Sequence, residues 1–359
     1  MLHLDTLWSV LIAILWVGFF VLEGFDFGVG VLHTIIGRTD PERATVLSTI
    51  GPWWDGNEVW LIVAGAGTFA AFPGWYATMF SALYLALLLV LVALMARGVA
   101  FEFARKHEDE RWLRAWTWCT TGGSLLIPLL LGVGLGDLLG GLPIDSSHNF
   151  TGNFFDLLTP YGLWTGVTLL GLCLLHGATF IKLRTTGELR ERARAISRPL
   201  GWVAIALVVG FVVWTRSVAG GPTIPDPVEV LAVIAVVFAV LLSATDHDGW
   251  AFSASAVAIA ACVGSIFIDL YPRVMVSSTN AAYNLTVSNT ASGHYALVVM
   301  TVVTVIFFPV VLIYQGWSFH VFRARVTGGP ATAESGSAGT PPAPPASSGA
   351  AVRPAVPPA

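Results

Sequence analysis

Two pairs of acidic residues lie in otherwise apolar stretches and could do chemistry. Glu23 and Asp26 are three residues apart, so on a helix they share one face. Asp55 and Glu58 repeat this spacing in a tryptophan-rich segment. A carboxyl group can take up and release a proton, and an ionisable group inside a membrane helix is commonly functional. The four acids therefore predict a proton path.

The second pair also has a purely structural interpretation. Asp55 could be the N-cap of a helix and Glu58 its third residue, which together would form a capping box, and Pro52 suits a helix start. An acid in the first helical turn is also stabilised by the helix dipole. Capping and proton transfer are compatible, so the spacing alone leaves both interpretations open.

Other reactive residue types give weaker signals. Of the eight histidines, only His176 lies well inside an apolar stretch, and without a second histidine beside it we expect a hydrogen-bonded core residue rather than a haem ligand. Cys119, Cys173 and Cys262 are far apart and are expected to be small buried side chains. No nucleotide-binding, zinc or catalytic-triad motif is legible, and no basic stripe predicts nucleic-acid binding.

The elements that position these residues are predicted to be membrane helices. Of the 359 residues, 55% are hydrophobic and only 11% are charged, and the mean hydropathy is +0.74. Soluble domains have about 25% charged residues, so this chain cannot cover a water-facing surface of normal size. The sequence predicts an all-α integral membrane protein, a bundle of about nine transmembrane helices.

The predicted spans are stretches of about 20 apolar residues. They lie near residues 7–36, 52–71, 76–104, 115–139, 160–182, 199–216, 228–244, 250–271 and 295–320. Of the 18 Lys and Arg residues, 15 fall in the connections on one side and in the tail, and basic loops are typically cytoplasmic. We therefore expect the N-terminus outside, the C-terminus in the cytoplasm and an odd number of spans.

The two ends of the chain differ in kind. No basic region precedes the first apolar run, and Glu23 and Asp26 follow where a cleavage site would have to lie, so we expect a retained first helix rather than a signal peptide. Residues 1–322 are predicted to form one polytopic membrane domain. Residues 323–359, rich in Pro, Ala, Gly and Ser, are predicted to be a disordered cytoplasmic tail.

Several segments resemble the signature segments of subunit II of the cytochrome bd quinol oxidases. They occur in the order and spacing of that family, and the resemblance runs from the first span to about Phe322. The segments are Gly24-Phe25-Asp26-Phe27-Gly28-Val29-Gly30, Trp54-Asp55-Gly56-Asn57-Glu58-Val59-Trp60-Leu61, Thr151-Gly152-Asn153-Phe154-Phe155-Asp156-Leu157-Leu158, Gly177-Ala178-Thr179-Phe180, Arg184-Thr185-Thr186-Gly187-Glu188-Leu189 and Ser277-Ser278-Thr279.

The resemblance implies a multi-pass subunit of the bacterial plasma (inner) membrane that ligates no haem and stabilises a haem-bearing subunit I. The complex would oxidise quinol and reduce O₂ to water with cytoplasmic protons, using two haems b and one haem d ligated by the partner. The resemblance also places Asp55, the acid of the Trp-Asp-Gly-Asn motif, on a proton path. From their positions, we assign Asp26, Glu23 and Glu58 to the same path. A small accessory subunit, membrane lipid and a structural quinone in this chain are compatible further partners.

Two positions depart from the family, and two other classes of function stay open. Glu58 stands where relatives can have Gln, so it is either an accessory carboxylate or simply tolerated. His176 also stands where relatives can have Gln, which argues against an essential ligand.

A proton-coupled secondary transporter would likewise place acids inside membrane helices, whereas in a purely structural scaffold subunit the acids would be replaceable.

Overall fold

The protein is almost entirely helical in the part of the chain that the structure describes. The structure, a computed structural model, describes residues 4–107, 109–220 and 224–327. The α-helices are α1 (Leu4–Ile36), α2 (Asp40–Ser48), α3 (Trp54–Ala71), α4 (Pro73–Ala82), α5 (Tyr84–Phe103), α6 (Glu110–Gly140), α7 (Pro160–Arg184), α8 (Gly187–Ala219), α9 (Pro227–Ser243), α10 (Asp248–Leu270), α11 (Val287–Thr290) and α12 (His294–Val321). The short elements are the 3-10 helices η1 (Ala104–Lys106), η2 (Phe154–Leu157) and η3 (Ala281–Tyr283) and the antiparallel strands β1 (Arg273–Met275) and β2 (Leu285–Thr286).

Local sequence signals set several helix ends. Asp226 caps α9 by accepting from two backbone N–H groups, and Glu229 completes a capping box. Helices α6 and α8 are followed by Gly141 and Gly220, whose φ angles of 97° and 67° are readily adopted only by glycine. These signals stop the helices where the chain must turn back into the bundle.

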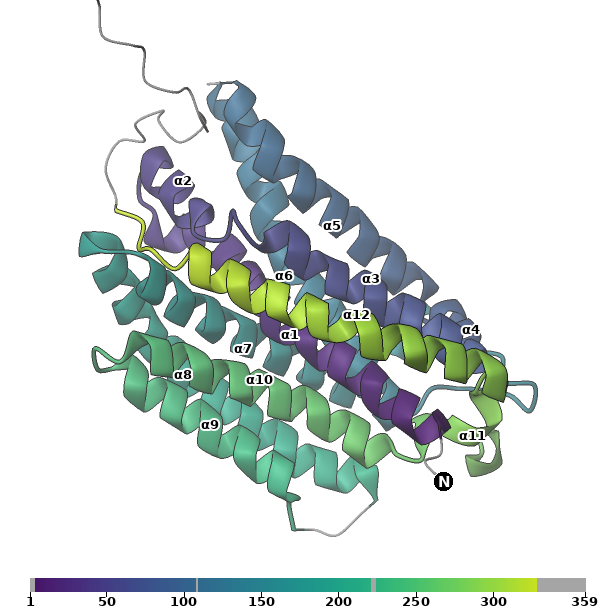
Figure 1. Cartoon of the computed structure of the whole chain (residues 1–359). Coiled ribbons are helices and arrows are strands. Elements are labelled where there is room, and N and C mark those ends of the chain that lie inside the picture. The colour runs from purple at the N-terminus through teal and green to yellow at the C-terminus, as the bar shows by residue number, and fades with distance from the viewer. Residues whose placement is uncertain (1–3, 108, 221–223, 328–359) are drawn as a thin grey trace, which may run out of the picture. The chain divides into compact units, whose positions relative to one another are not determined.

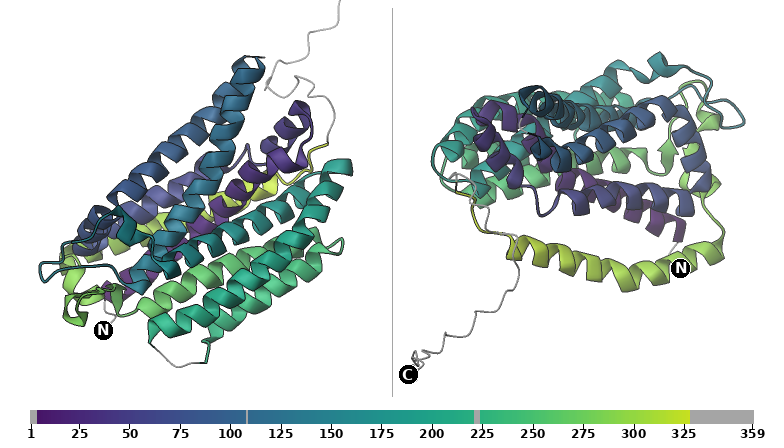
Figure 2. Two further views of the ribbon diagram at one scale, coloured as in Figure 1. Left: turned by 180° about the vertical axis from the view of Figure 1, so that it is seen from behind. Right: turned by 90° about the horizontal axis from the view of Figure 1, so that it is seen from above.

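Helix α1 is the central helix. It packs against α3, α6, α7 and α10, and its second half is buried without interruption from Glu23 to His33 (Figure 1). Helices α6 to α10 pack against one another in chain order. Helix α12 returns along the outside of the bundle beside α1 and α3, with only Leu297 and Ser318 buried (Figure 2). The acids of α1 therefore lie inside the bundle, under α12.

Glycines allow the central helices to approach closely. A Cβ atom added at Gly28 of α1 would lie 2.1 Å from the Cys173 carbonyl oxygen of α7, and one added at Gly177 would lie 2.5 Å from the Gly28 backbone. Between α6 and α7, a Cβ atom at Gly132 would lie 2.7 Å from the Gly166 backbone. Small residues at such contacts are the usual device for packing membrane helices.

The predicted helical membrane class is confirmed. Among the described residues, seven helices are long and apolar enough to span a membrane: α1, α5 with η1, α6, α7, α8, α10 and α12. The predicted spans 52–71 and 228–244 correspond to α3, which has 18 residues and opens with polar ones, and to α9, which is apolar but has 17 residues.

Two predicted spans have different bounds. The stretch 76–104 is broken at Leu83, which leaves the helical conformation (φ −89°, ψ 12°) and separates α4 from α5. No Pro or Gly marks this break, so hydropathy could not reveal it. The stretch 199–216 is only the apolar part of α8, which begins at Gly187. Hydropathy overlooked the first turns of α8 because they are charged.

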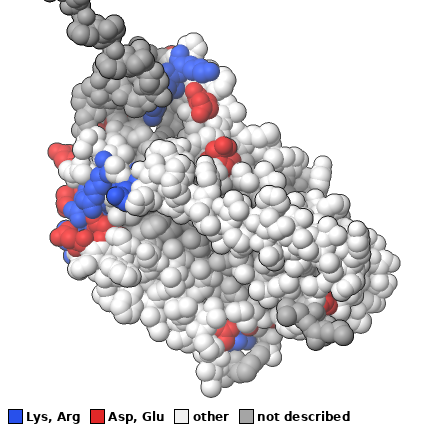
Figure 3. Space-filling view, in the orientation of Figure 1, with Lys and Arg blue, Asp and Glu red and all other residues white. Residues whose placement is uncertain are grey.

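Charged side chains gather at one end of the bundle. Figure 3 shows Lys, Arg, Asp and Glu concentrated at the end that carries α2, with a broad uncharged surface over the middle of this face. The opposite end carries the β1–β2 pair and α11. An uncharged band flanked by polar ends is the surface expected of a protein lying across a bilayer.

The first residues after α12 are fixed to the bundle. The Val326 N–H donates to the Arg184 carbonyl at 2.7 Å, and Arg325 lies 3.0 Å from Asp248. The rest of the predicted disordered tail, residues 328–359, lies outside the described residues.

Candidate functional site

Two of the four predicted acids bind one arginine. Arg97 of α5 donates from Nη1 to Oε1 of Glu23 on α1 and to Oε1 of Glu58 on α3, both at 2.6 Å. The guanidinium lies over the rings of Phe27 and Phe101, each centroid 5.1 Å away. One cation thus ties the two predicted acid pairs together across three helices.

The fourth member of this site is Asp26, which is held by an amide. Asn57 of α3 donates from Nδ2 to Asp26 Oδ2 at 2.7 Å and to the Leu22 carbonyl at 3.1 Å. Its Oδ1 accepts from Gln315 Nε2 of α12 at 3.0 Å. We call Glu23, Asp26, Asn57, Glu58 and Arg97 the acid cluster.

The acid cluster is buried and incompletely paired. Glu23, Asp26, Asn57 and Arg97 have no exposed surface, whereas 21% of the Glu58 side chain is exposed. Four buried atoms have no hydrogen-bond partner among the described residues: Glu23 Oε2, Asp26 Oδ1, Arg97 Nε and Arg97 Nη2. Buried polar atoms are normally bonded to protein or water, so the cluster has the capacity to hold water or an exchangeable proton.

The charges of the acid cluster do not balance when all three carboxyl groups are ionised. Glu23, Asp26 and Glu58 then carry three negative charges against the one positive charge of Arg97. An unbalanced charge inside a membrane protein is costly, and a proton bound by the cluster reduces the imbalance. The arrangement therefore suits a group of residues that takes up and releases protons.

Asp55 stands apart from the acid cluster. It is exposed in the first turn of α3, and its carboxylate makes no hydrogen bond or ion pair with another described residue. The capping interpretation was wrong: Trp53, not Asp55, is the N-cap, and it makes no side-chain cap bond. Glu58 does not complete a capping box because its carboxylate turns to Arg97.

His176 is a core residue, as predicted. Its Nδ1 lies 2.7 Å from Ser255 Oγ and its Nε2 lies 3.2 Å from the Val21 carbonyl, so Nε2 carries the proton. The ring is fully buried and stacks on Phe252. Both nitrogens are engaged, so this residue does not fit the role of a haem ligand. Cys173 and Cys262 are buried and Cys119 is partly buried, and all three are free thiols.

Sequence reasoning missed Arg97, Asn57 and Gln315 as members of the site. A signal existed for Arg97, because a lone arginine in an apolar helix needs a buried partner, and the nearest candidates were the predicted acids. The roles of Asn57 and Gln315 depend on how α1, α3 and α12 pack, which no spacing along the chain reveals.

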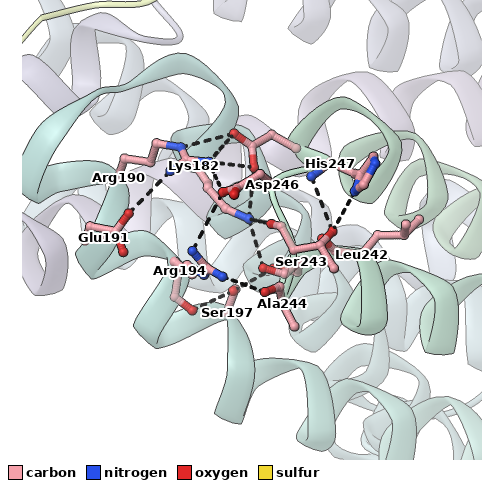
Figure 4. A network of polar contacts seen from close by, with 12 residues as sticks. Lys182, Arg190, Glu191, Arg194, Ser197, Leu242, Ser243, Ala244, Asp246 and His247 are labelled. Carbon is pink, nitrogen blue, oxygen red and sulfur yellow. Dashed lines mark hydrogen bonds and ion pairs between the residues drawn. The ribbon is translucent and has the colours of Figure 1, made fainter.

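A second polar network fixes the turns at the charged end (Figure 4). Lys182, fully buried at the end of α7, donates to the carbonyls of Ser243 and Thr245 at 2.9 and 2.6 Å and pairs with Asp248 at 2.9 Å. Arg190 of α8 also pairs with Asp248, at 3.1 Å. These contacts of Lys182 and Arg190 tie the α9–α10 turn to α7 and α8, so we assign the network a structural role.

At the same end, Glu42 attaches α2 to α8. Arg192 of α8 donates to its carboxylate at 2.9 Å and the Arg38 N–H donates to it at 2.7 Å. These hydrogen bonds lower the pKa of Glu42 to about 2, so its carboxylate is ionised at any physiological pH.

A third group of acids lies at the opposite end. Carboxylate oxygens of Asp226, Glu229 and Asp269 lie within 4.8 Å of one another, a spacing that could suit a cation. Arg216 already occupies this position: it lies 2.9 Å from Glu229 and also pairs with Asp269. Arg216 also lies 3.9 Å from Asp226, so the group is an ion-pair network joining α8, α9 and α10.

The chain is similar to known proteins along nearly its whole length. Residues 4–322 match the profile of the family described as cytochrome bd terminal oxidase subunit II. The cytochrome bd ubiquinol oxidase subunit 2 of Bacillus subtilis (strain 168) is 44% identical over 331 residues, which cover 91% of this chain and 98% of that protein. The cytochrome bd-I ubiquinol oxidase subunit 2 of Escherichia coli (strain K12) is 34% identical, with 89% and 94% covered.

A solved structure supports the fold. A chain of the bd oxidase from Geobacillus thermodenitrificans superposes with a TM-score of 0.73, covering 89% of this chain and 99% of that one. The two sequences are 17% identical, so this likeness speaks for the arrangement of helices alone.

Proposed function

Since the chain belongs to the cytochrome bd terminal oxidase subunit II family, we propose that its acid cluster carries protons toward the site where the oxidase reduces O₂. The chain is a multi-pass bacterial membrane protein and a subunit of a quinol-oxidising terminal oxidase. The Bacillus subtilis and Escherichia coli relatives are oxidase subunits, so the proton-coupled transporter is not favoured.

We further propose which subunit of the complex ligates the haems. The partner subunit I ligates two haems b and one haem d, and this chain ligates none, which the engaged ring nitrogens of His176 support. Nine helices, α3 and α9 included, cross the bilayer with the N-terminus outside. A small accessory subunit, bound lipid and a structural quinone in this chain are compatible with this arrangement.

The observation that carries the proton role is that Arg97 binds two carboxyl groups, those of Glu23 and Glu58, while Asn57 holds a third, that of Asp26, beside them. Reduction of O₂ to water consumes protons, and a path through protein needs groups that both accept and release them. Arg97 holds Glu23 and Glu58 within reach of one nitrogen, and Asn57 holds Asp26 beside them. The exposed Asp55, at the start of the same helix as Glu58, is placed to collect protons at the surface.

Replacing Asp26 and Asp55 by Asn, one at a time, tests this function in the assembled oxidase. Asn keeps the shape of Asp but carries no titratable proton. We expect normal haem spectra with slower O₂ reduction, by about tenfold or more for Asp55→Asn and by less for Asp26→Asn, since positioned proton-transfer groups contribute about 10²–10⁴-fold.

A matched control is Glu110→Gln. Glu110 is an exposed acid at the start of α6 that pairs only with Arg114, one turn away, so its loss should leave turnover unchanged. Wild-type turnover in both fully assembled Asn variants would remove the acids from the mechanism.

A further inference from the structure

A cavity of about 320 Å³ lies at the charged end, beside the acid cluster but not part of it. Parts of α1, α2, α3, α5 and α6 enclose it, with α2 forming one wall. Its lining is mixed: His33, Arg43, Arg105 and Thr117 supply polar groups, and Trp54 and Phe101 supply aromatic rings. A cavity of this size and polarity is roomy enough for several water molecules.

The cavity and the acid cluster are stacked along the same three helices. His33 lies two turns beyond Asp26 on α1, so the two are about 10 Å apart along the helix axis. Phe101 lies one turn beyond Arg97 on α5, and Trp54 lies one turn before Glu58 on α3. The cavity therefore begins about one turn from the residues that hold the cluster together.

One aromatic layer separates the cavity from the acid cluster. The rings of Trp54 and Phe101 are 4.9 Å apart, and the other neighbour of Phe101 is the Arg97 guanidinium, 5.1 Å from its centroid. Phe101 thus lines the cavity and also covers the cluster.

Unpaired polar atoms lie on both sides of this layer. On the cavity side, Trp116 has an indole N–H without a partner among the described residues. On the cluster side, Arg97 has two nitrogens without a described partner. Groups of this kind normally bind ordered water, which indicates that water extends to both faces of the layer.

We propose that this cavity is a water-filled antechamber through which protons pass from the charged end of the bundle to the acid cluster, with Trp54 and Phe101 as the partition. The inference rests on the proposed proton role of the cluster and names its route of access. Protons move from water to water and then to the carboxylates of Glu58 and Glu23. Each step breaks one O–H bond and forms another, and no other covalent bond changes.

Filling the cavity tests the antechamber in the assembled oxidase. Ala44 of α2 lines the cavity, so Ala44→Trp places an indole in it, whereas the neighbouring Thr45 does not line it and Thr45→Trp is a matched control. We expect both variants to assemble with wild-type haem spectra. Ala44→Trp should slow O₂ reduction several-fold and increase its solvent deuterium isotope effect, and Thr45→Trp should change neither.

Water access is tested separately by thiol labelling, which does not depend on turnover. In a Cys119→Ser background, Thr117→Cys lies in the cavity wall, and Thr121→Cys, one turn further along α6, does not. A charged methanethiosulfonate reagent should label Thr117→Cys readily and Thr121→Cys slowly. Equal resistance of both thiols would show that the cavity is dry and would overturn the proposal.

The outcomes separate the antechamber from the proton role itself. If Asp26→Asn and Asp55→Asn are slow but Ala44→Trp turns over like Thr45→Trp, protons use another route and only the antechamber is wrong. If the acid variants keep the wild-type rate, the proton role fails. Slow turnover of both the acid variants and Ala44→Trp, with a reactive Thr117→Cys, supports both.

Discussion

At the scale of single residues, Arg97 is the group on which the others depend. One of its nitrogens serves two carboxylates from two other helices, and its remaining polar atoms are buried between aromatic rings. Removing one partner of a buried ion pair leaves the other charge unpaired, which destabilises more than losing both. Arg97 therefore has a structural role in holding together the acids for which we propose proton transfer.

Replacing Arg97 by Gln should destabilise the assembled oxidase by about 3–5 kcal/mol, the usual effect of breaking a buried ion pair. Adding Glu23→Gln to that variant removes one stranded carboxylate and should restore part of the loss. Thermal unfolding of the purified complex measures both, and Arg114→Gln, at an exposed pair, is the control. Additive losses from Arg97→Gln and Glu23→Gln would show that the two residues do not interact.

The site could be predicted from the sequence only in part. The three-residue spacing put Glu23 and Asp26 on one face, and the structure buries both. The same spacing could not tell that Glu58 turns inward to Arg97 while Asp55, one turn earlier, faces out. That difference depends on which face of α3 meets α1 and α5, which is a property of tertiary packing.

At the scale of elements, the contact between α1 and α7 is among the tightest in the bundle. Gly28 and Gly177 meet backbone to backbone, so the two helix axes are held at their closest approach where the acids of α1 lie nearby. These glycines are visible in the sequence, but nothing along the chain identifies α7 as the partner of α1.

Gly177→Val should prevent assembly, or lower the stability by more than the about 1–3 kcal/mol typical of overpacking, because backbone rather than a flexible side chain fills the space. Gly264→Ala is the matched control, since a Cβ atom at that position meets nothing within 4 Å. The yield of complex with its full haem spectrum and its thermal midpoint are the measurements. Normal assembly of Gly177→Val would mean that α1 and α7 can separate without loss.

Hydropathy located helices better than it located their ends. It found the apolar part of α8 but not its charged beginning, since a helix that continues into water carries no apolar signal. It also ran through Leu83, where α4 and α5 are distinct helices. Such breaks are set by tertiary contacts, for example the hydrogen bond from Thr78 to the His148 carbonyl at 2.9 Å, which holds α4 to a distant loop.

At the scale of the whole molecule, the uneven distribution of charge predicts how the protein lies in the membrane. The basic residues of α2, of η1, of the start of α8 and of the segment after α12 lie at the end that we expect to face the cytoplasm. A reporter active only in the cytoplasm, fused after Thr327, should therefore be active. Activity of a periplasm-specific reporter at that position would contradict the orientation.

Truncation tests where the membrane domain ends. A chain stopped after Thr327 keeps the Arg325–Asp248 ion pair and the hydrogen bond between Val326 and Arg184, and we expect it to assemble and turn over normally. A chain stopped after Phe322 loses both, and its complex should unfold at a lower temperature by a few degrees. Equal stability of the two truncations would show that residues 323–327 contribute nothing to the fold.

The order in which the acid cluster is built follows from the positions of its helices. Synthesis begins at the N-terminus, so α1 leaves the ribosome with two acids before Arg97 of α5 exists. An unpaired Asp at a helix centre costs about 2.5–3.5 kcal/mol on the insertion scale, so α1 gains its full stability in lipid only when α5 arrives. Helices α1, α3 and α5 must therefore stay together at the insertion machinery. Gln315 of α12 is made after α1, α3 and α5, so its hydrogen bond to Asn57 forms last.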